Sequence, residues 1–363
     1  MDAALQALAE QVRAAAGRHE LLRIRAGGSK DFYGNTPRGT PLDPRALRGI
    51  VSYEPTELAL AVRCGTPLAE VEALLDSQQQ MLAFEPPHFG ATATIGGCIA
   101  SGLAGPRRAS AGYAYGGVRD FVLGAKLLDG RAQLLSFGGM VMKNVAGYDA
   151  ARLLTGSLGI LGVIVEICLK VVPKHAVERT LQFELAEISA LQQLNRWGGQ
   201  PLPISASMWR SNRLLLRLSG SAAAVAAASA RLGGTPAEPD GACWRGLREH
   251  SDAFFAGDAP LWRISVPPTA PPLELGEQQL IEWGGALRWI RSPAPVASIR
   301  NRAQQLAGHA TLFRGGDRLA GAFTPLAPGL LAIHRRLREQ FDPAGVFDCR
   351  RLYAELDRAD NAR

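Results

Sequence analysis

The residues best suited to chemistry lie between positions 84 and 105, where five glycines are interleaved with small polar and apolar side chains. Thr92, Thr94 and Ser101 stand among these glycines, and Pro86 stiffens the entry to the stretch. Glycine lets a backbone approach a ligand closely and adopt positive φ, and successive N–H groups in such a turn can wrap a phosphate. We therefore interpret this stretch as a cradle for a diphosphate.

Two further glycine-rich connections meet predicted strands in the first half of the chain. Residues 26–34 follow a strand predicted at 21–26, and residues 156–162 lead into a strand predicted at 163–170. The first connection is not followed by a helix with G-x-G-x-x-G spacing, which argues against a Rossmann site. Each loop alone is equally typical of a tight turn, whereas loops that converge on one extended ligand favour an anion site.

Length and charge bound the class of protein. At 363 residues the chain is long enough for two domains. Its net charge of +7 comes largely from scattered arginines, and no basic block alternates with aromatic residues, so a nucleic-acid-binding surface is disfavoured. An anionic cofactor, an anionic substrate or an acidic partner explains the charge equally well.

Cysteine usage and hydropathy add further exclusions. The five cysteines are far apart and form no C-x-x-C motif, which argues against a zinc site or an iron–sulfur cluster. Reduced thiols are typical of a cytosolic protein. No signal-peptide pattern opens the chain, and no uncharged apolar run reaches the roughly 18 residues of a membrane span. We expect a cytoplasmic protein, and association with the inner face of the cytoplasmic membrane through a complex stays open.

The elements that position these loops alternate between helix and strand. The periodicity predicts a helix over residues 3–16 and strands over 47–53 and 57–64. A helix then runs to about residue 79, with Thr66 predicted as its N-cap and Pro67 at its first position.

Two hairpins are also predicted. Residues 121–128 and 131–137 read as strands joined by a two-residue turn at Asp129 and Gly130. Residues 204–210 and 213–219 form the second pair of strands.

The glycine motifs stop near residue 172, and the second half of the chain has a different organisation. Strand and helix patterns follow one another there in a strand–strand–helix order, which predicts an antiparallel sheet with helices on one face. A helix is predicted over 276–283, and a final helix over 328–340. The predicted fold class is α+β.

The order of these motifs resembles the FAD-binding fold of the vanillyl-alcohol oxidase and p-cresol methylhydroxylase (PCMH) superfamily. The resemblance covers roughly residues 20–175 and a C-terminal segment at 341–343. Within the superfamily, the segments at 53–58, 64–72 and 81–87 resemble the family of FAD-binding E subunits of bacterial glycolate oxidases. The motifs that carry the superfamily resemblance are residues 25–29, 94–97, 100–102, 143–144, 147–149 and 156–164.

The resemblance implies a cofactor, a division of the chain and a set of binding residues. The cofactor would be FAD, held non-covalently, and no metal is implied. A PCMH-type FAD-binding domain of two α+β subdomains would span 1–175, an α+β cap domain with an antiparallel sheet 176–325, and a C-terminal helix and tail 326–363 would pack back on the FAD domain. The cofactor-binding residues implied are Arg25, Ala26, Gly27, Gly28, Ser29, Pro86, Thr94, Ile95, Gly96, Gly97, Ser101, Gly102, Gly156, Ser157, Gly159, Gly162, Val163 and Ile164. The adenine end would lie near 159–164.

The sequence departs from the superfamily in two respects. Many relatives attach the flavin covalently through a histidine, and His88 is the only histidine near these loops. Relatives that oxidise 2-hydroxy acids carry an H-x-G-D-G-N motif, but the corresponding residues 310–318 contain no histidine. The catalytic residues are therefore unknown, with Arg210, His309 and Arg314 as weak candidates.

The function that the resemblance implies is that of a flavoprotein oxidoreductase subunit acting on CH–OH donors. It would hold a flavin for electron transfer in the oxidation of glycolate to glyoxylate during glycolate catabolism. A larger FAD-containing subunit would carry the main substrate chemistry, and an iron–sulfur subunit would take the electrons. Two alternatives stay open, namely a self-sufficient FAD-dependent 2-hydroxy-acid dehydrogenase of the D-lactate type, and a non-catalytic scaffold with a vestigial flavin site.

Overall fold

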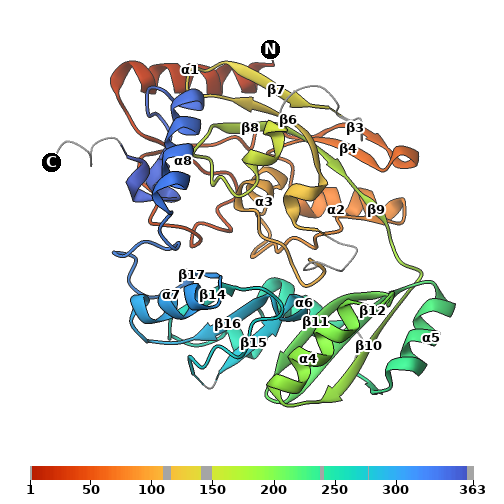
Figure 1. Cartoon of the computed structure of the whole chain (residues 1–363). Coiled ribbons are helices and arrows are strands. Elements are labelled where there is room, and N and C mark those ends of the chain that lie inside the picture. Colours follow the sequence, from red (N-terminus) through yellow and green to blue (C-terminus); the bar gives the residue numbers. More distant parts are fainter. Residues whose placement is uncertain (1, 109–115, 140–148, 238–240, 277, 358–363) are drawn as a thin grey trace.

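The structure is a computed structural model that describes residues 2–108, 116–139, 149–237, 241–276 and 278–357. Figure 1 shows two bodies, one above the other, each built around its own sheet. The chain passes from the upper to the lower body after β9 (Val172–Pro173) and returns after β17 (His309–Arg314), so that both ends of the chain lie in the upper body.

The upper body is organised around a five-stranded antiparallel sheet in the order β3-β4-β8-β6-β7. Strand β8 lies at its centre and is buried along most of its length, as its almost continuous apolar sequence requires. The sheet strands are β3 (Ile50–Glu54), β4 (Ala59–Arg63), β6 (Val122–Leu128), β7 (Leu134–Gly138) and β8 (Val163–Lys170). Outside the sheet lie α1 (Ala3–Arg18), α2 (Leu68–Ser77), α3 (Ile95–Ser101), the parallel pair β1 (Leu22–Ile24) and β2 (Thr40–Leu42), and β5 (Gln80–Met81), which pairs with β9.

The lower body holds an eight-stranded antiparallel sheet in the order β13-β10-β12-β11-β15-β16-β14-β17. Its strands are β10 (Val177–Glu184), β11 (Ile204–Arg210), β12 (Arg213–Gly220), β13 (Thr235–Pro236), β14 (Leu261–Ser265), β15 (Gln279–Glu282), β16 (Leu287–Arg291) and β17. Its helices are α4 (Glu187–Gly198), α5 (Ala222–Leu232), α6 (Ala242–Glu249) and α7 (Val296–Gln305).

Side chains alternate across this lower sheet as the period of a strand requires. Trp209, Leu214 and Ile281 pack with α4 and α5 in one cluster. Their neighbours Met208 and Leu280 belong instead to a cluster that also contains Tyr33 and Leu103 of the upper body. This part of the lower sheet is therefore covered by α4 and α5 on one face, and its other face packs against α6 and residues of the upper body.

The C-terminal segment returns to the upper body through α8 (Pro328–Phe341). Phe341 and Phe347 are buried in the upper core. Residue Phe347 forms a parallel bridge with Leu22 of β1. The tail thus adds to the edge of β1, at the strand that precedes the first glycine-rich loop.

Several predicted details are wrong. Helix α2 begins at Leu68, and Thr66 does not cap it, because the Thr66 hydroxyl bonds instead to the backbone of Gly49. The β6–β7 turn spans residues 129–133 rather than two residues, since the Asp129 carboxylate accepts backbone N–H groups inside a wider loop.

A third difference concerns the predicted helix at 276–283. Residues Gln279–Glu282 form β15 between β11 and β16, because tertiary strand pairing outweighs weak local helix propensity. The motif residues 143–144 and 147–148 lie outside the described residues. Within the part of the chain that the structure describes, no helix is long and apolar enough to cross a membrane.

Candidate functional site

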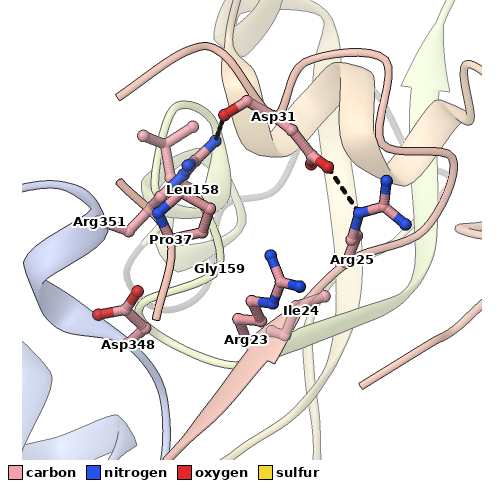
Figure 2. A pocket seen from close by; sticks show the side chains of 9 residues that line it. All are labelled: Arg23, Ile24, Arg25, Asp31, Pro37, Leu158, Gly159, Asp348 and Arg351. Carbon is pink, nitrogen blue, oxygen red and sulfur yellow. Dashed lines mark hydrogen bonds and ion pairs between the residues drawn. The ribbon is translucent and has the colours of Figure 1, made fainter. Parts of the chain in front are cut away.

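Three adjoining hollows run along the edge of the upper body where β1, α3 and the start of β8 meet. We name them by their linings. The amide hollow is lined by residues 26–31 with Thr94, Gly97 and Ala100. The apolar hollow is lined by Ala26, Pro44, Cys64 and residues 162–164 among others. The charged hollow is lined by three arginines and two aspartates (Figure 2). Ile24 and Leu158 line all three, so the hollows form one continuous groove.

The amide hollow owes its character to the backbone of residues 26–30. The N–H groups of these five residues have no hydrogen-bond partner among the described residues. Gly27 lies so close to the opposite loop that a Cβ would stand 1.6 Å from the carbonyl oxygen of Thr92, and Gly28 has a φ of +71°. Only glycine fits these two positions without distortion. The loop therefore presents unbonded amide donors, which suit an anion.

Lys30 supplies a positive charge beside these amides. Its ammonium donates to the carbonyl oxygen of His88 at 3.2 Å, and its side chain lines the same hollow. Burial lowers the pKa of Lys30 below its ordinary value. Arg351 also lines this hollow and fixes the loop, since its guanidinium donates to the carbonyl oxygens of Asp31 at 2.9 Å and Lys30 at 3.2 Å.

The amides at the start of α3 are already occupied, which revises the predicted cradle. The N–H of Ile95 donates to Thr66 O at 3.0 Å, that of Gly96 to Cys64 O at 2.8 Å, and that of Gly97 to the Thr94 hydroxyl at 3.2 Å. These residues shape a wall of the groove, and their backbone donors are satisfied within the protein. The backbone donors of the amide hollow that have no partner among the described residues are thus those of residues 26–30, together with the N–H of Thr94.

The apolar hollow lies beside the first residues of β8. The pairing of β4 with β8 ends at Arg63 and Glu166, so Val163 and Ile164 extend beyond the end of β4 next to this hollow. Small residues on the opposite wall, Gly96, Gly97 and Ala100, leave room for a flat group. A flat apolar ring with polar edges suits this lining.

Most of the residues predicted to bind the cofactor line this groove. Those that do are Arg25, Ala26, Gly27, Gly28, Ser29, Thr94, Gly96, Gly97, Ser101, Gly159, Gly162, Val163 and Ile164. Those that do not line any of the three hollows are Pro86, Ile95, Gly102, Gly156 and Ser157. Ile95, Gly102 and Gly156 of the last group hydrogen-bond within or next to α3, which forms a wall of the groove. Gly156, for example, donates its N–H to Ile99 O at 3.1 Å.

Sequence reasoning missed several lining residues. They are Arg23, Ile24, Lys30, Asp31, Pro37, Pro44, Cys64, Ala100, Leu158, Asp348 and Arg351. Ile24, Lys30 and Leu158 adjoin predicted residues in the chain, and this adjacency was the available signal. Asp348 and Arg351 come from the far end of the chain, and only the pairing of the tail with β1 brings them here.

The three catalytic candidates are not brought together. Arg210 forms an ion pair with Asp252. His309 is exposed at the start of β17. Arg314 stacks on aromatic rings, 4.3 Å from the centroid of Phe32 and 5.0 Å from that of Phe89. No contact joins these three residues in the described ranges.

His88 and metal binding can be assessed directly. The His88 Nε2 lies 2.9 Å from Glu72 Oε2, and its ring does not line the groove. Among the described residues, no group of three or more histidine, cysteine, aspartate or glutamate side chains is arranged to hold a metal ion. All five cysteines are free.

Comparisons with known proteins agree with this architecture. The family model for an FAD binding domain matches residues 3–138. Over 351 residues the chain is 48% identical to the glycolate oxidase subunit GlcE of Escherichia coli (strain K12), covering 97% of this chain and 98% of that protein. It is 39% identical over 158 residues to the glycolate oxidase subunit GlcD of Bacillus subtilis (strain 168), covering 44% of this chain and 33% of that one. A solved structure of alkyldihydroxyacetonephosphate synthase superposes with a TM-score of 0.64 at 15% identity, over 93% of this chain and 73% of that one.

These findings establish the class of protein and its family. The match to the FAD binding domain and the likeness to glycolate oxidase subunits define an FAD-binding oxidoreductase, and the superposed structure shows a fold of the PCMH type, as the motifs predicted. The chain belongs to the family of the glycolate oxidase subunit GlcE, and its cofactor is FAD.

The groove fits this cofactor chemically. FAD carries a diphosphate, and the unbonded amides of residues 26–30 with the Lys30 ammonium are suitable donors for it. The adenine ring is flat with polar edges, and the apolar hollow beside Val163 and Ile164 has that character. The residues present therefore match the two most distinctive parts of the nucleotide half.

Proposed function

We propose that this chain is the FAD-holding subunit of a glycolate oxidase complex and that it binds its flavin non-covalently. In the complex, oxidation of glycolate to glyoxylate releases two electrons and two protons, and bound FAD supplies an acceptor for such electrons. The single observation that carries the proposal is the groove of residues 26–30, Thr94, Gly97 and 162–164, in a chain 48% identical to a glycolate oxidase subunit.

The groove residues would bind and orient the cofactor. Residues 26–30 would hold the diphosphate through backbone N–H groups, Lys30 would balance its charge, and Val163 and Ile164 would flank the adenine. Non-covalent attachment follows from the engagement of His88 with Glu72, away from the groove. The domain boundaries at residues 175 and 325 belong to the same proposal.

The partners follow from the same reasoning. The names of the two relatives describe subunits of a glycolate oxidase, which supports a partner subunit in a complex. That partner would be the larger FAD-containing subunit that the resemblance implies, and it would carry the main substrate chemistry. Because the chain has no C-x-x-C motif, its electrons would pass to an external carrier such as an iron–sulfur subunit. The complex, rather than this chain, would make any contact with the inner face of the cytoplasmic membrane.

One observation favours a second candidate, a self-sufficient 2-hydroxy-acid dehydrogenase. The Arg314 guanidinium lies on Phe32 and Phe89 and forms no ion pair with a described residue, so a substrate carboxylate would complement it. His250 lies nearby, 5.2 Å from Phe313 between ring centroids. Burial, together with the Arg314 charge, lowers the pKa of His250 well below its ordinary value and keeps the ring neutral.

An absorption spectrum of the purified chain distinguishes these functions. A flavin spectrum with about one FAD per chain, released by denaturation without proteolysis, is expected and would exclude a vestigial site. Addition of glycolate or D-lactate to the isolated chain should leave the flavin oxidised, whereas addition to the assembled complex should bleach it. Bleaching of the isolated chain would overturn the relay function in favour of the self-sufficient dehydrogenase.

A further inference from the structure

The charged hollow contains two groups that lack partners. Its volume is about 40 Å³, and its lining includes Arg23, Arg25, Asp31, Asp348 and Arg351 (Figure 2). This space accommodates a hydroxyl-bearing group rather than a whole nucleotide. Neither Arg23 nor Asp348 was recognised as a site residue in the sequence.

The C-terminal tail brings Asp348 to this hollow. The N–H of Leu22 donates to Val346 O at 2.7 Å, and the N–H of Asp348 donates to Leu22 O at 3.0 Å. These two bonds place Asp348 beside β1, where Arg23 is the next residue of the strand. The backbone positions of Arg23 and Asp348 are therefore fixed by this pairing.

Three of the five charged residues of the hollow are already engaged. Arg25 Nε lies 2.6 Å from Asp31 Oδ2, and Arg351 donates to backbone carbonyl oxygens. The backbone of Arg23 pairs within β1 and β2, but its guanidinium, by contrast, makes no hydrogen bond or ion pair with any described residue. Three guanidiniums face two carboxylates, so the hollow carries an excess of one positive charge.

Asp348 is 6% exposed, and its two oxygens differ. Oδ2 accepts the N–H of Arg38 at 2.7 Å. Oδ1 is buried and has no partner among the described residues. A buried acceptor without a donor costs free energy that a ligand can restore. Because a carboxylate only accepts hydrogen bonds, the ligand group must present a donor, and a hydroxyl does so.

The position of the hollow identifies which hydroxyl. It shares Ile24, Leu158 and Gly159 with the apolar hollow, and Ile24, Asp31, Leu158 and Arg351 with the amide hollow. The amide and apolar hollows also share Ala26, Thr94, Gly97 and Ala100, so they adjoin each other directly. A nucleotide with its diphosphate in the amide hollow and its base in the apolar hollow therefore places the connecting ribose where the three hollows meet, at Ile24 and Leu158, with the charged hollow beside it. The ribose carries a 2′- and a 3′-hydroxyl, and the phosphate next to it is anionic.

We propose that Asp348 accepts a hydrogen bond from a ribose hydroxyl of the adenosine half of FAD, and that Arg23 pairs with the adjoining phosphate. This inference rests on the assignment of FAD to the groove. It makes the C-terminal tail a specificity element that selects FAD over flavins without an adenosine half.

Binding of adenosine nucleotides to the flavin-free full chain tests the inference without any redox readout. ADP and 2′,3′-dideoxy-ADP are titrated by calorimetry at one fixed salt concentration. The parent chain should bind the dideoxy compound about tenfold or more weakly, because a hydrogen bond to a charged acceptor is lost. Equal affinities of the parent chain for the two compounds would overturn the role of Asp348.

Two variants assign the effect to the named residues. Asp348→Asn retains an oxygen for the Arg38 N–H but replaces the unpartnered acceptor. The affinity of this variant for ADP should therefore fall to that for dideoxy-ADP, while its affinity for dideoxy-ADP should equal that of the parent. Arg23→Gln should weaken the binding of ADP about tenfold and leave the binding of adenosine unchanged. The matched control Arg179→Gln removes the same charge from an exposed position of β10 and should change neither.

The outcomes separate this inference from the proposed function. A parent chain that binds FAD but does not discriminate between ADP and dideoxy-ADP refutes the ribose contact and leaves the function intact. An Asp348→Asn chain that keeps the parent ratio of affinities refutes it as well. A parent chain that binds neither FAD nor ADP refutes the proposed function itself.

Discussion

Replacing Glu85 with glutamine removes one charge from a buried ionic cluster that joins the two bodies of the molecule. Glu85 belongs to the upper body, and its carboxylate accepts two bonds from Arg217 of β12, each 2.9 Å long. It also accepts the backbone N–H of Arg107 at 3.0 Å. The Arg107 guanidinium in turn pairs with Glu178 of β10. Two carboxylates thus balance two guanidiniums whose side chains are only 3% and 4% exposed.

The magnitude follows from this balance. Without the Glu85 charge, the cluster keeps an uncompensated positive charge in a nearly dry interior, and breaking a buried pair in this way costs about 3–5 kcal/mol. With an m-value of about 3 kcal/mol per molar urea, the unfolding midpoint of Glu85→Gln falls by about 1–1.7 M. The exposed pair Arg45–Asp43 provides a control, since Asp43→Asn should cost no more than about 1 kcal/mol.

The pH dependence has a defined sign. Burial alone would raise the pKa of Glu85, but the Arg217 and Arg107 guanidiniums outweigh burial and hold the pKa below its ordinary value. A depressed pKa stabilises the fold fully above the unfolded value of about 4.3, and the stabilisation is lost as the pH falls through the folded pKa. The difference between the parent and Glu85→Gln should therefore persist from pH 5 to pH 8 and shrink in stronger acid.

Urea unfolding followed by tryptophan fluorescence measures both effects. A double variant, Glu85→Gln with Arg217→Met, should be more stable than the sum of the single effects, because it removes the charge that Glu85→Gln leaves unpaired. A Glu85→Gln chain within 1 kcal/mol of the parent at pH 7 would refute the reasoning. So would strict additivity in the double variant.

Three further predictions concern single side chains. Burial raises the pKa of Glu282 to about 7. Such a group stabilises the fold below its unfolded pKa, and this stabilisation is lost as the pH rises through 7. The free energy of unfolding of Glu282→Gln, measured in urea titrations, should therefore rise relative to that of the parent by up to about 3 kcal/mol between pH 4 and pH 8. Gly28→Ala should weaken FAD binding in a fluorescence titration because of its φ of +71°, whereas Gly49→Ala, also at positive φ but outside the groove, should cost stability alone. Burial raises the pKa of Cys64 to about 12, so alkylation of the native chain should label the partly exposed Cys243 and spare Cys64, as mass spectrometry would show.

The sequence by itself determined the features that depend on local backbone requirements. Gly27 and Gly28 stand where a Cβ would strike Thr92 or where φ is positive, and such demands are visible as glycines at fixed places after a strand. The apolar run of β8 and the strands of the second half were also predictable, because the spacing of apolar residues along a strand reflects burial on one or both of its faces. The order of these motifs was enough to predict an FAD-binding fold.

Only the tertiary structure decided which polar groups remain available in the groove. The N–H groups of residues 95–97 donate hydrogen bonds to Thr66, Cys64 and Thr94, and no local sequence pattern shows these bonds. Residues 279–282 became a strand because β11 and β16 lie on either side of them. Asp348 lines the same hollow as Arg23, more than three hundred residues away in the chain, because the tail pairs with β1. Contacts between residues distant in sequence are set by the packing of whole elements, so their partners cannot be read from either segment alone.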